Sequence, residues 1–106
     1  MAWLVLIAAG ALEIVWSYYM KQSDGFMRLV PTVITVVTSL ASFALLAIAM
    51  KSLPLGTAYM VWTGIGAVGA FIVGVLVLGE QASAMRLLAA ALIVSGLLLM
   101  KFSTTA

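Results

Sequence analysis

The chain has 106 residues, of which 66% are hydrophobic and only 8% are charged, with a formal net charge of +2. Soluble domains carry about 25% charged residues, so this composition leaves too little polar surface for a water-soluble globule. Without Cys or His, disulfides and the commonest metal ligands are excluded, and we expect no metal and no cofactor. Because its five cations are scattered along the chain, no basic patch for nucleic acid is expected either. The composition predicts a small all-α integral membrane protein.

Four apolar segments can cross a bilayer as helices, for which roughly 20 residues are needed. Segments 29–50 and 52–79 contain no charge. The helix within segment 52–79 should begin near Thr57, because Pro54 and Gly56 precede it. The first segment lacks the basic start of a signal peptide, so we expect it to be retained. The predicted helices cover 2–20, 29–50, 57–79 and 84–102, within a single transmembrane domain that spans residues 1–106.

The positive charges only weakly favour one orientation of the chain in the membrane. Four spans place Lys51 and Lys101 on one side of the membrane, and Lys21, Arg28 and Arg86 on the other. A bias of one cation is small for the positive-inside rule, so either one weakly set topology or insertion in both orientations agrees with the charges. Inverted copies could pair as a dimer around a midplane site, an arrangement that transporters often use.

The first helix carries Glu13 at its midpoint. An ionisable residue inside a membrane is functional by default, and no cation lies at a matching depth. The missing countercharge must therefore be a proton, an ion or a substrate. Gly10 leaves room beside the carboxylate, and Trp16, one turn on, offers an aromatic wall or an indole donor to it. The alternative is a protonated Glu13 that hydrogen-bonds a neighbouring helix.

Candidate partners of Glu13 lie on the second and third helices. Ser42 lies toward the middle of the second helix, where it either serves a site or packs helices together. Tyr59 and Trp62 are three residues apart and share a helix face. They form either an interfacial aromatic belt or the aromatic lining of a cation site.

Small residues mark the third and fourth helices. The third helix contains Gly64, Gly66 and Gly69 in a pattern that also occurs in dinucleotide-binding turns, but here it lies inside an apolar run. Glycines there allow close packing and weaken the helix, so we expect a conformational hinge. The fourth helix offers a small-residue surface for dimer packing, formed by Ala89, Ala90, Ser95 and Gly96.

Taken together, these motifs resemble those of the small multidrug resistance transporters over essentially the whole chain. The first half contributes Gly10-x-x-Glu13, Lys21, Gly25-Phe26, Arg28-Leu29 and Pro31. The second half contributes Pro54-x-Gly56-Thr57-Ala58-Tyr59-x-x-Trp62-Thr63-Gly64-Ile65-Gly66. Within the family, Glu13-x-x-Trp16 and the segment from Gly56 to Gly64 are similar to the guanidinium exporter subtype. Tyr18 and Tyr19 stand where the family usually has small or aliphatic residues.

The resemblance implies an antiparallel, dual-topology homodimer in the bacterial inner membrane, in which two central glutamates bind protons or one cation in turn. The tyrosine pair leaves room for a paired homologue in place of the second copy. The implied binding-site residues are Gly10, Glu13, Trp16, Ser42, Tyr59 and Trp62.

From the residues and the resemblance together we expect a proton-coupled antiporter that exports guanidinium or small guanidinyl cations, not an enzyme. Guanidinium suits the site because its planar donor fork matches a carboxylate. Two alternatives stay open: a multidrug exporter of quaternary ammonium or aromatic cations, and a non-transporting membrane subunit or assembly factor.

Overall fold

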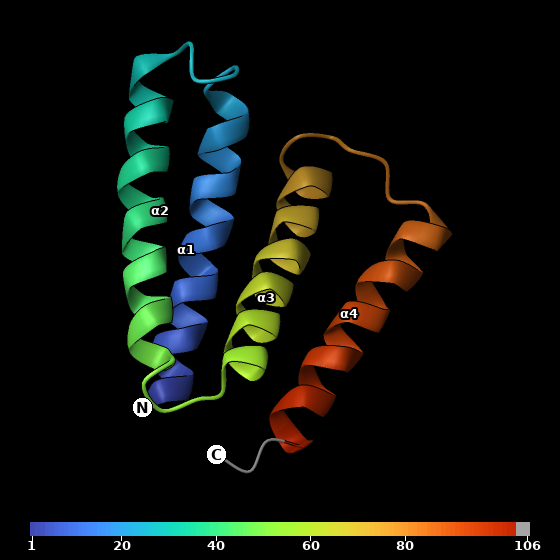
Figure 1. The fold of residues 1–106 in the computed structure, drawn as a ribbon. Helices are drawn as coiled ribbons and strands as arrows, with labels where there is room; N and C mark the ends of the chain where they lie inside the picture. Colours follow the sequence, from blue (N-terminus) through green and yellow to red (C-terminus); the bar gives the residue numbers. More distant parts are fainter. Residues whose placement is uncertain (104–106) are drawn as a thin grey trace.

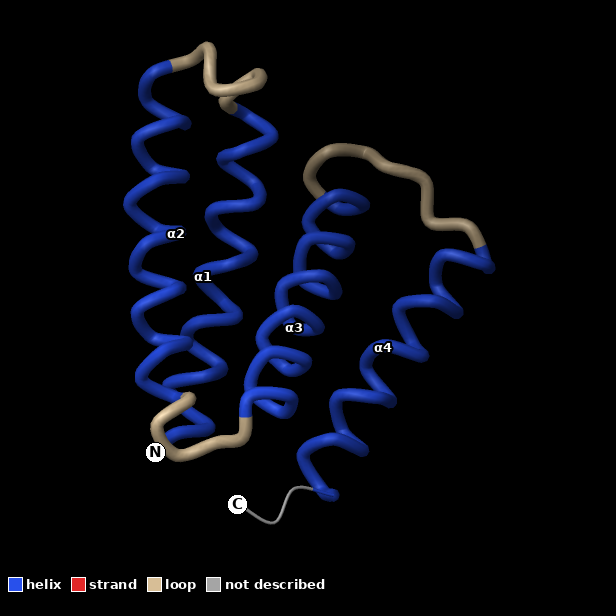
Figure 2. Tube along the Cα trace, viewed as in Figure 1, coloured by secondary structure: helices blue, strands red, loops and turns tan. Residues whose placement is uncertain are grey.

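A computed structural model describes residues 1–103 of the chain as four helices joined by loops (Figure 1). The helices are α1 (Ala2–Gln22), α2 (Leu29–Ala49), α3 (Leu55–Leu76) and α4 (Ala84–Ser103). Outside the helices, the described residues form only loops and turns (Figure 2). All four helices are long and apolar enough to cross a membrane, which confirms the predicted all-α membrane architecture.

Helix α3 begins earlier than predicted, at Leu55 rather than near Thr57. Pro54 precedes the helix with φ −59°, and its carbonyl accepts a 3.0 Å hydrogen bond from the Ala58 amide. Proline has no amide hydrogen, but at the start of a helix that hydrogen would have no partner within the helix, so nothing is lost. The fixed φ of proline also suits the first turn. The proline therefore starts the helix instead of delaying it.

The same helix ends at Leu76, three residues before the predicted limit. Gly79 has φ +73°, a left-handed conformation that favours glycine. The chain reverses there, and the Glu80 amide donates a 2.9 Å hydrogen bond back to the Gly74 carbonyl. This glycine therefore closes the helix before the α3–α4 loop.

Helices α1, α2 and α3 form one packed group, and α4 packs mainly on α3. Helix α4 also reaches α1 at one point, where Lys101 Nζ lies 4.9 Å from the centre of the Trp3 ring. Figure 1 shows that α4 diverges from the other three helices at the end where it joins the α3–α4 loop. The buried core lies among the first three helices and the α2–α3 loop, and no residue of α4 is buried. The core residues are Leu6, Ala9, Leu46, Ala49, Leu53, Ala58, Val61 and Trp62.

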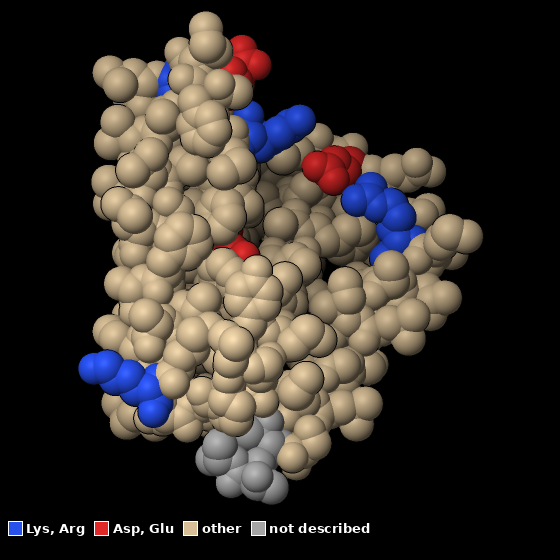
Figure 3. Space-filling model, viewed as in Figure 1, with Lys and Arg blue, Asp and Glu red and all other residues tan. Residues whose placement is uncertain are grey.

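On the face shown in Figure 3, charged side chains gather mainly at the two ends of the helices, and the surface between them is largely uncharged. Within residues 1–103 the only ion pair joins Arg86 and Glu80, at 3.4 Å, at the α3–α4 loop. Arg86 also donates a 2.7 Å hydrogen bond to the Gln81 carbonyl and lies 5.0 Å from the centre of the Phe71 ring. The charges thus mark the membrane interfaces and leave the middle of the bundle to Glu13.

Candidate functional site

Glu13 lies near the midpoint of α1, a helix about 31 Å long at 1.5 Å per residue. Its side chain is half-buried between α1 and α3. One carboxylate oxygen, Oε1, is buried and has no hydrogen-bond partner among the described residues. An acceptor buried without a donor is costly in a protein, and more so where lipid surrounds the helices.

Three close approaches hold α1 against α3, and each places a glycine opposite a larger side chain. Gly10 of α1 faces Ile65, a Cβ on Gly66 would collide with the Glu13 carboxylate, and a Cβ on Gly69 would collide with Ile14. We call these three pairs the α1–α3 seam. The seam brings the α3 backbone directly against the Glu13 side chain.

A second set of contacts joins α2 and α3 to α1 through Ser42. The Trp62 indole Nε1 donates a 3.0 Å hydrogen bond to Ser42 Oγ, and Ser42 Oγ donates a 2.7 Å hydrogen bond to the Ala9 carbonyl. Ser42 is fully buried and Trp62 is 7% exposed. Two predicted site residues, Ser42 and Trp62, therefore meet directly, and their hydrogen bonds reach the backbone residue just before Gly10.

Four aromatic side chains run in contact across the three helices. Trp16 meets Phe43 with ring centres 6.3 Å apart, Phe43 meets Trp62 at 5.9 Å, and Trp62 meets Tyr59 at 5.5 Å. We call Trp16, Phe43, Trp62 and Tyr59 the aromatic row. Edge-on and tilted rings of this kind can line a site for a delocalised cation.

The predicted hydrogen bond from Trp16 to Glu13 is not formed in the structure. Trp16 Nε1 is buried, and among residues 1–103 it has no acceptor, while the ring lies edge-on to Phe43. One turn of α1 thus carries both an unpaired acceptor, Glu13 Oε1, and an unpaired donor, the Trp16 indole. The role of Trp16 as an aromatic wall beside Glu13 stays a prediction.

The glycines of α3 are points of close packing in this conformation. The helix is continuous from Leu55 to Leu76, through Gly64, Gly66 and Gly69. A Cβ on Gly64 would collide with Leu97 of α4, whereas the other two positions belong to the α1–α3 seam. The structure shows no break at the glycines, and the hinge stays a prediction.

Comparison with known proteins identifies the family. A sequence model described as Small Multidrug Resistance protein matches residues 1–93. Two similar curated proteins are both named "Guanidinium exporter": one from Escherichia coli (strain K12), 59% identical, and one from Salmonella typhimurium, 55% identical. Each alignment covers 98% of this chain and 99% of the relative.

The chain belongs to the small multidrug resistance family. The resemblance found in the sequence is thereby confirmed. As a member of this family, the chain is a transporter rather than an enzyme, and a multi-pass protein of the bacterial inner membrane.

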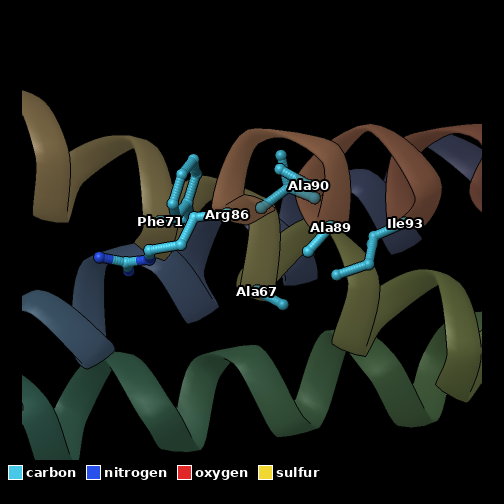
Figure 4. Close-up of a pocket in the computed structure, with 7 residues that line it drawn as sticks. Ala67, Phe71, Arg86, Ala89, Ala90 and Ile93 are labelled. Atoms are coloured by element: carbon cyan, nitrogen blue, oxygen red, sulfur yellow. The ribbon is translucent and has the colours of Figure 1, made fainter. Parts of the chain in front are cut away.

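In this small multidrug resistance protein, the predicted dimer-packing residues of α4 divide between two faces. Ala89 and Ala90 line a cavity of about 140 Å³ between α3 and α4, and Gly96 lines a neighbouring one of about 340 Å³. Figure 4 shows Ala89 and Ala90 of α4 above Ala67, to the right of the Arg86 and Phe71 side chains. Ser95 is exposed and donates to the Ala91 carbonyl of its own helix at 2.8 Å. Three of the four thus face α3 of the same chain.

Two groups that take part in these contacts were not predicted from the sequence. Phe43 links Trp16 to Trp62 but stands in an apolar run, where one more aromatic residue carries no distinguishing signal. The Ala9 carbonyl accepts from Ser42, and no side-chain pattern predicts a backbone acceptor. Spacing on one helix cannot show which residues of other helices meet it.

Proposed function

We propose that the chain exports guanidinium or small guanidinyl cations in exchange for protons, and that Glu13 is the group that binds either. The observation that carries the proposal is the buried, unpartnered Oε1 of Glu13 near the middle of a membrane-spanning helix. Neither Lys nor Arg pairs with it in the described part of the chain. One carboxylate carries one negative charge, so a proton and a monovalent cation compete for it.

Guanidinium fits the surroundings of this carboxylate. Its planar donor fork can bind both oxygens of a carboxylate, and its flat face can rest on aromatic rings. The aromatic row offers such rings on three helices, starting one turn from Glu13 at Trp16. The relatives named guanidinium exporters, at 55–59% identity, support this substrate class.

The proposed site residues have distinct roles. Glu13 binds the proton or the cation, and Gly10 keeps α1 close to α3 beside it. Ser42 fixes the Trp62 ring by a hydrogen bond, while Tyr59 and Trp16 extend the aromatic lining.

We further propose that the working unit is an antiparallel homodimer of dual topology. One chain supplies a single Glu13 and four helices, of which α4 buries no residue. The nearly even division of cations between the two ends supports insertion in both orientations. In the proposed cycle, a substrate displaces protons from the two glutamates, and the dimer then exposes the site to the other side.

The family's description as multidrug resistance proteins favours a second candidate, export of quaternary ammonium cations. Purified protein in liposomes separates the candidates when equal concentrations of guanidinium and tetraethylammonium are added outside and the internal pH is followed. We expect guanidinium to raise the internal pH several-fold faster, because it enters as protons leave. A faster response to tetraethylammonium supports the second candidate. No response to either contradicts export and leaves a non-transporting subunit.

A further inference from the structure

Gly66 lies on α3 where the Glu13 side chain meets that helix. A Cβ atom at position 66 would lie 2.7 Å from Glu13 Cγ and closer still to its carboxyl carbon and Oε1. Real Cβ atoms do not come within 3.0 Å of such neighbours, so only glycine leaves the carboxyl group where it lies. Gly66 itself is buried.

The neighbouring glycines of α3 do not share this relationship. A Cβ on Gly64 would meet Leu97 of α4, and a Cβ on Gly69 would meet Ile14 of α1. Among the three glycines, only Gly66 faces an ionisable group. All three glycines can make the helix backbone more flexible. Of the three, only Gly66 also leaves space for the Glu13 carboxyl group.

We propose that Gly66 is a positioning residue for Glu13. Because Gly66 has no side chain, the α3 backbone leaves a space at this residue, which we call the seat. The seat holds the Glu13 carboxyl group against α3, in the position from which this group exchanges its proton for the cation. This inference rests on the proposed function of Glu13, and it assigns Gly66 a role distinct from that of a hinge. A methyl group at position 66 would collide with the Glu13 side chain from Cγ to Oε1, so it displaces the carboxyl group.

Reaction of Glu13 with a hydrophobic carbodiimide tests the seat without any transported substrate. The labelled fraction is measured by mass spectrometry over a range of pH, in the wild type, Gly66→Ala and the matched control Gly64→Ala. We expect the Gly66→Ala chain to be labelled at least threefold faster and with a shifted pH profile, because its carboxyl group is pushed out of the buried seat. The Gly64→Ala chain should stay within twofold of the wild type, since its methyl group meets Leu97.

Equal effects of the two substitutions, or no effect of either, would overturn the seat. If Gly66→Ala does not fold, the double variant with Glu13→Ala decides. Alanine at position 13 lacks every side-chain atom that the new methyl group would meet, so recovery of folding supports the seat and continued failure overturns it.

Exchange of guanidinium by the wild-type chain is measured separately. A chain that moves no guanidinium but shows the labelling difference contradicts the proposed function and supports the seat. A chain that moves guanidinium but shows no labelling difference contradicts the seat alone.

Discussion

Trp62 of α3 donates a hydrogen bond to Ser42 of α2, with 3.0 Å between Nε1 and Oγ, and both side chains are buried. The Ser42 hydroxyl uses its own hydrogen to reach the Ala9 carbonyl of α1 at 2.7 Å. One hydroxyl therefore joins three helices and fixes the orientation of the indole ring. Because the single hydrogen of the Ser42 hydroxyl is already donated, Ser42 has no hydrogen left to donate to a substrate in this conformation.

Replacing Ser42 by Ala should lower stability and exchange activity together. The change leaves the Trp62 indole hydrogen and the Ala9 carbonyl without their partner, which costs roughly 1–2 kcal/mol in a site that excludes water. Unfolding in detergent and guanidinium exchange in liposomes both report the effect.

Ser39→Ala is the matched control for this prediction. Ser39 lies on the same helix, and its hydroxyl donates only to the Val36 carbonyl of that helix, at 3.0 Å. Its removal should change neither stability nor exchange appreciably. Similar losses in both serine variants would show that the contact with Trp62 has no special importance.

Trp16 should restrict the site to small cations. Its ring stands edge-on to Phe43, one turn from Glu13, so Trp16→Gly opens space at the end of the aromatic row. We expect guanidinium exchange to fall and competition by bulky aromatic or quaternary cations to rise, as measured by competitive exchange at matched pH. An unchanged preference would remove Trp16 from the determinants of selectivity.

Trp16→Phe separates the two properties of this side chain. Phenylalanine keeps an aromatic wall but lacks the indole hydrogen, which has no acceptor among residues 1–103. A wild-type preference in this variant assigns selectivity to the ring. A preference like that of Trp16→Gly assigns it to the indole hydrogen, which must then find its acceptor in another state.

Tagged C-termini should be found on both sides of the membrane in comparable amounts, because the two ends of the bundle differ by one cation. Two or three Lys residues added beside Lys51 should hold that end inside and abolish exchange when the variant is expressed alone. A wild-type chain with one topology would contradict the antiparallel homodimer and leave a paired homologue as the source of the opposite orientation.

Gly79→Ala should destabilise the chain by about 1 kcal/mol, because φ +73° places alanine in the left-handed region. Gly56→Ala is the control: it lies in the first turn of α3, where a Cβ meets open space. Thermal unfolding in detergent compares the two. Equal stability of both variants would show that the end of α3 tolerates rearrangement at Gly79.

The sequence predicted the helices well because charges and Pro54 interrupt otherwise continuous apolar runs. The start of α3 was two residues off, since a proline can precede a helix directly as well as delay it. Hydropathy fixes which segments cross a membrane, but it says little about which faces meet. The preference of α4 for α3 therefore came only from the structure.

The sequence predicted the candidate site where burying a single residue in the membrane costs free energy whatever its neighbours are. A carboxylate at mid-membrane stands out in any sequence, and Glu13 did. Phe43 did not, because an aromatic residue in an apolar run serves equally as lipid contact, core or site. Gly66 was recognised as a small residue, but its use depends on the approach of α1, which no pattern within α3 encodes.

Proton movement driven by a guanidinium gradient, compared between the wild type and Glu13→Gln in liposomes, tests the central claim most directly. The amide keeps the size of the side chain and loses its negative charge, so it can hold neither a proton nor a cation in exchange. We expect the wild type to raise the internal pH when guanidinium is added outside, and the folded Gln variant to give no response above empty liposomes. A response of normal size from Glu13→Gln would contradict the account.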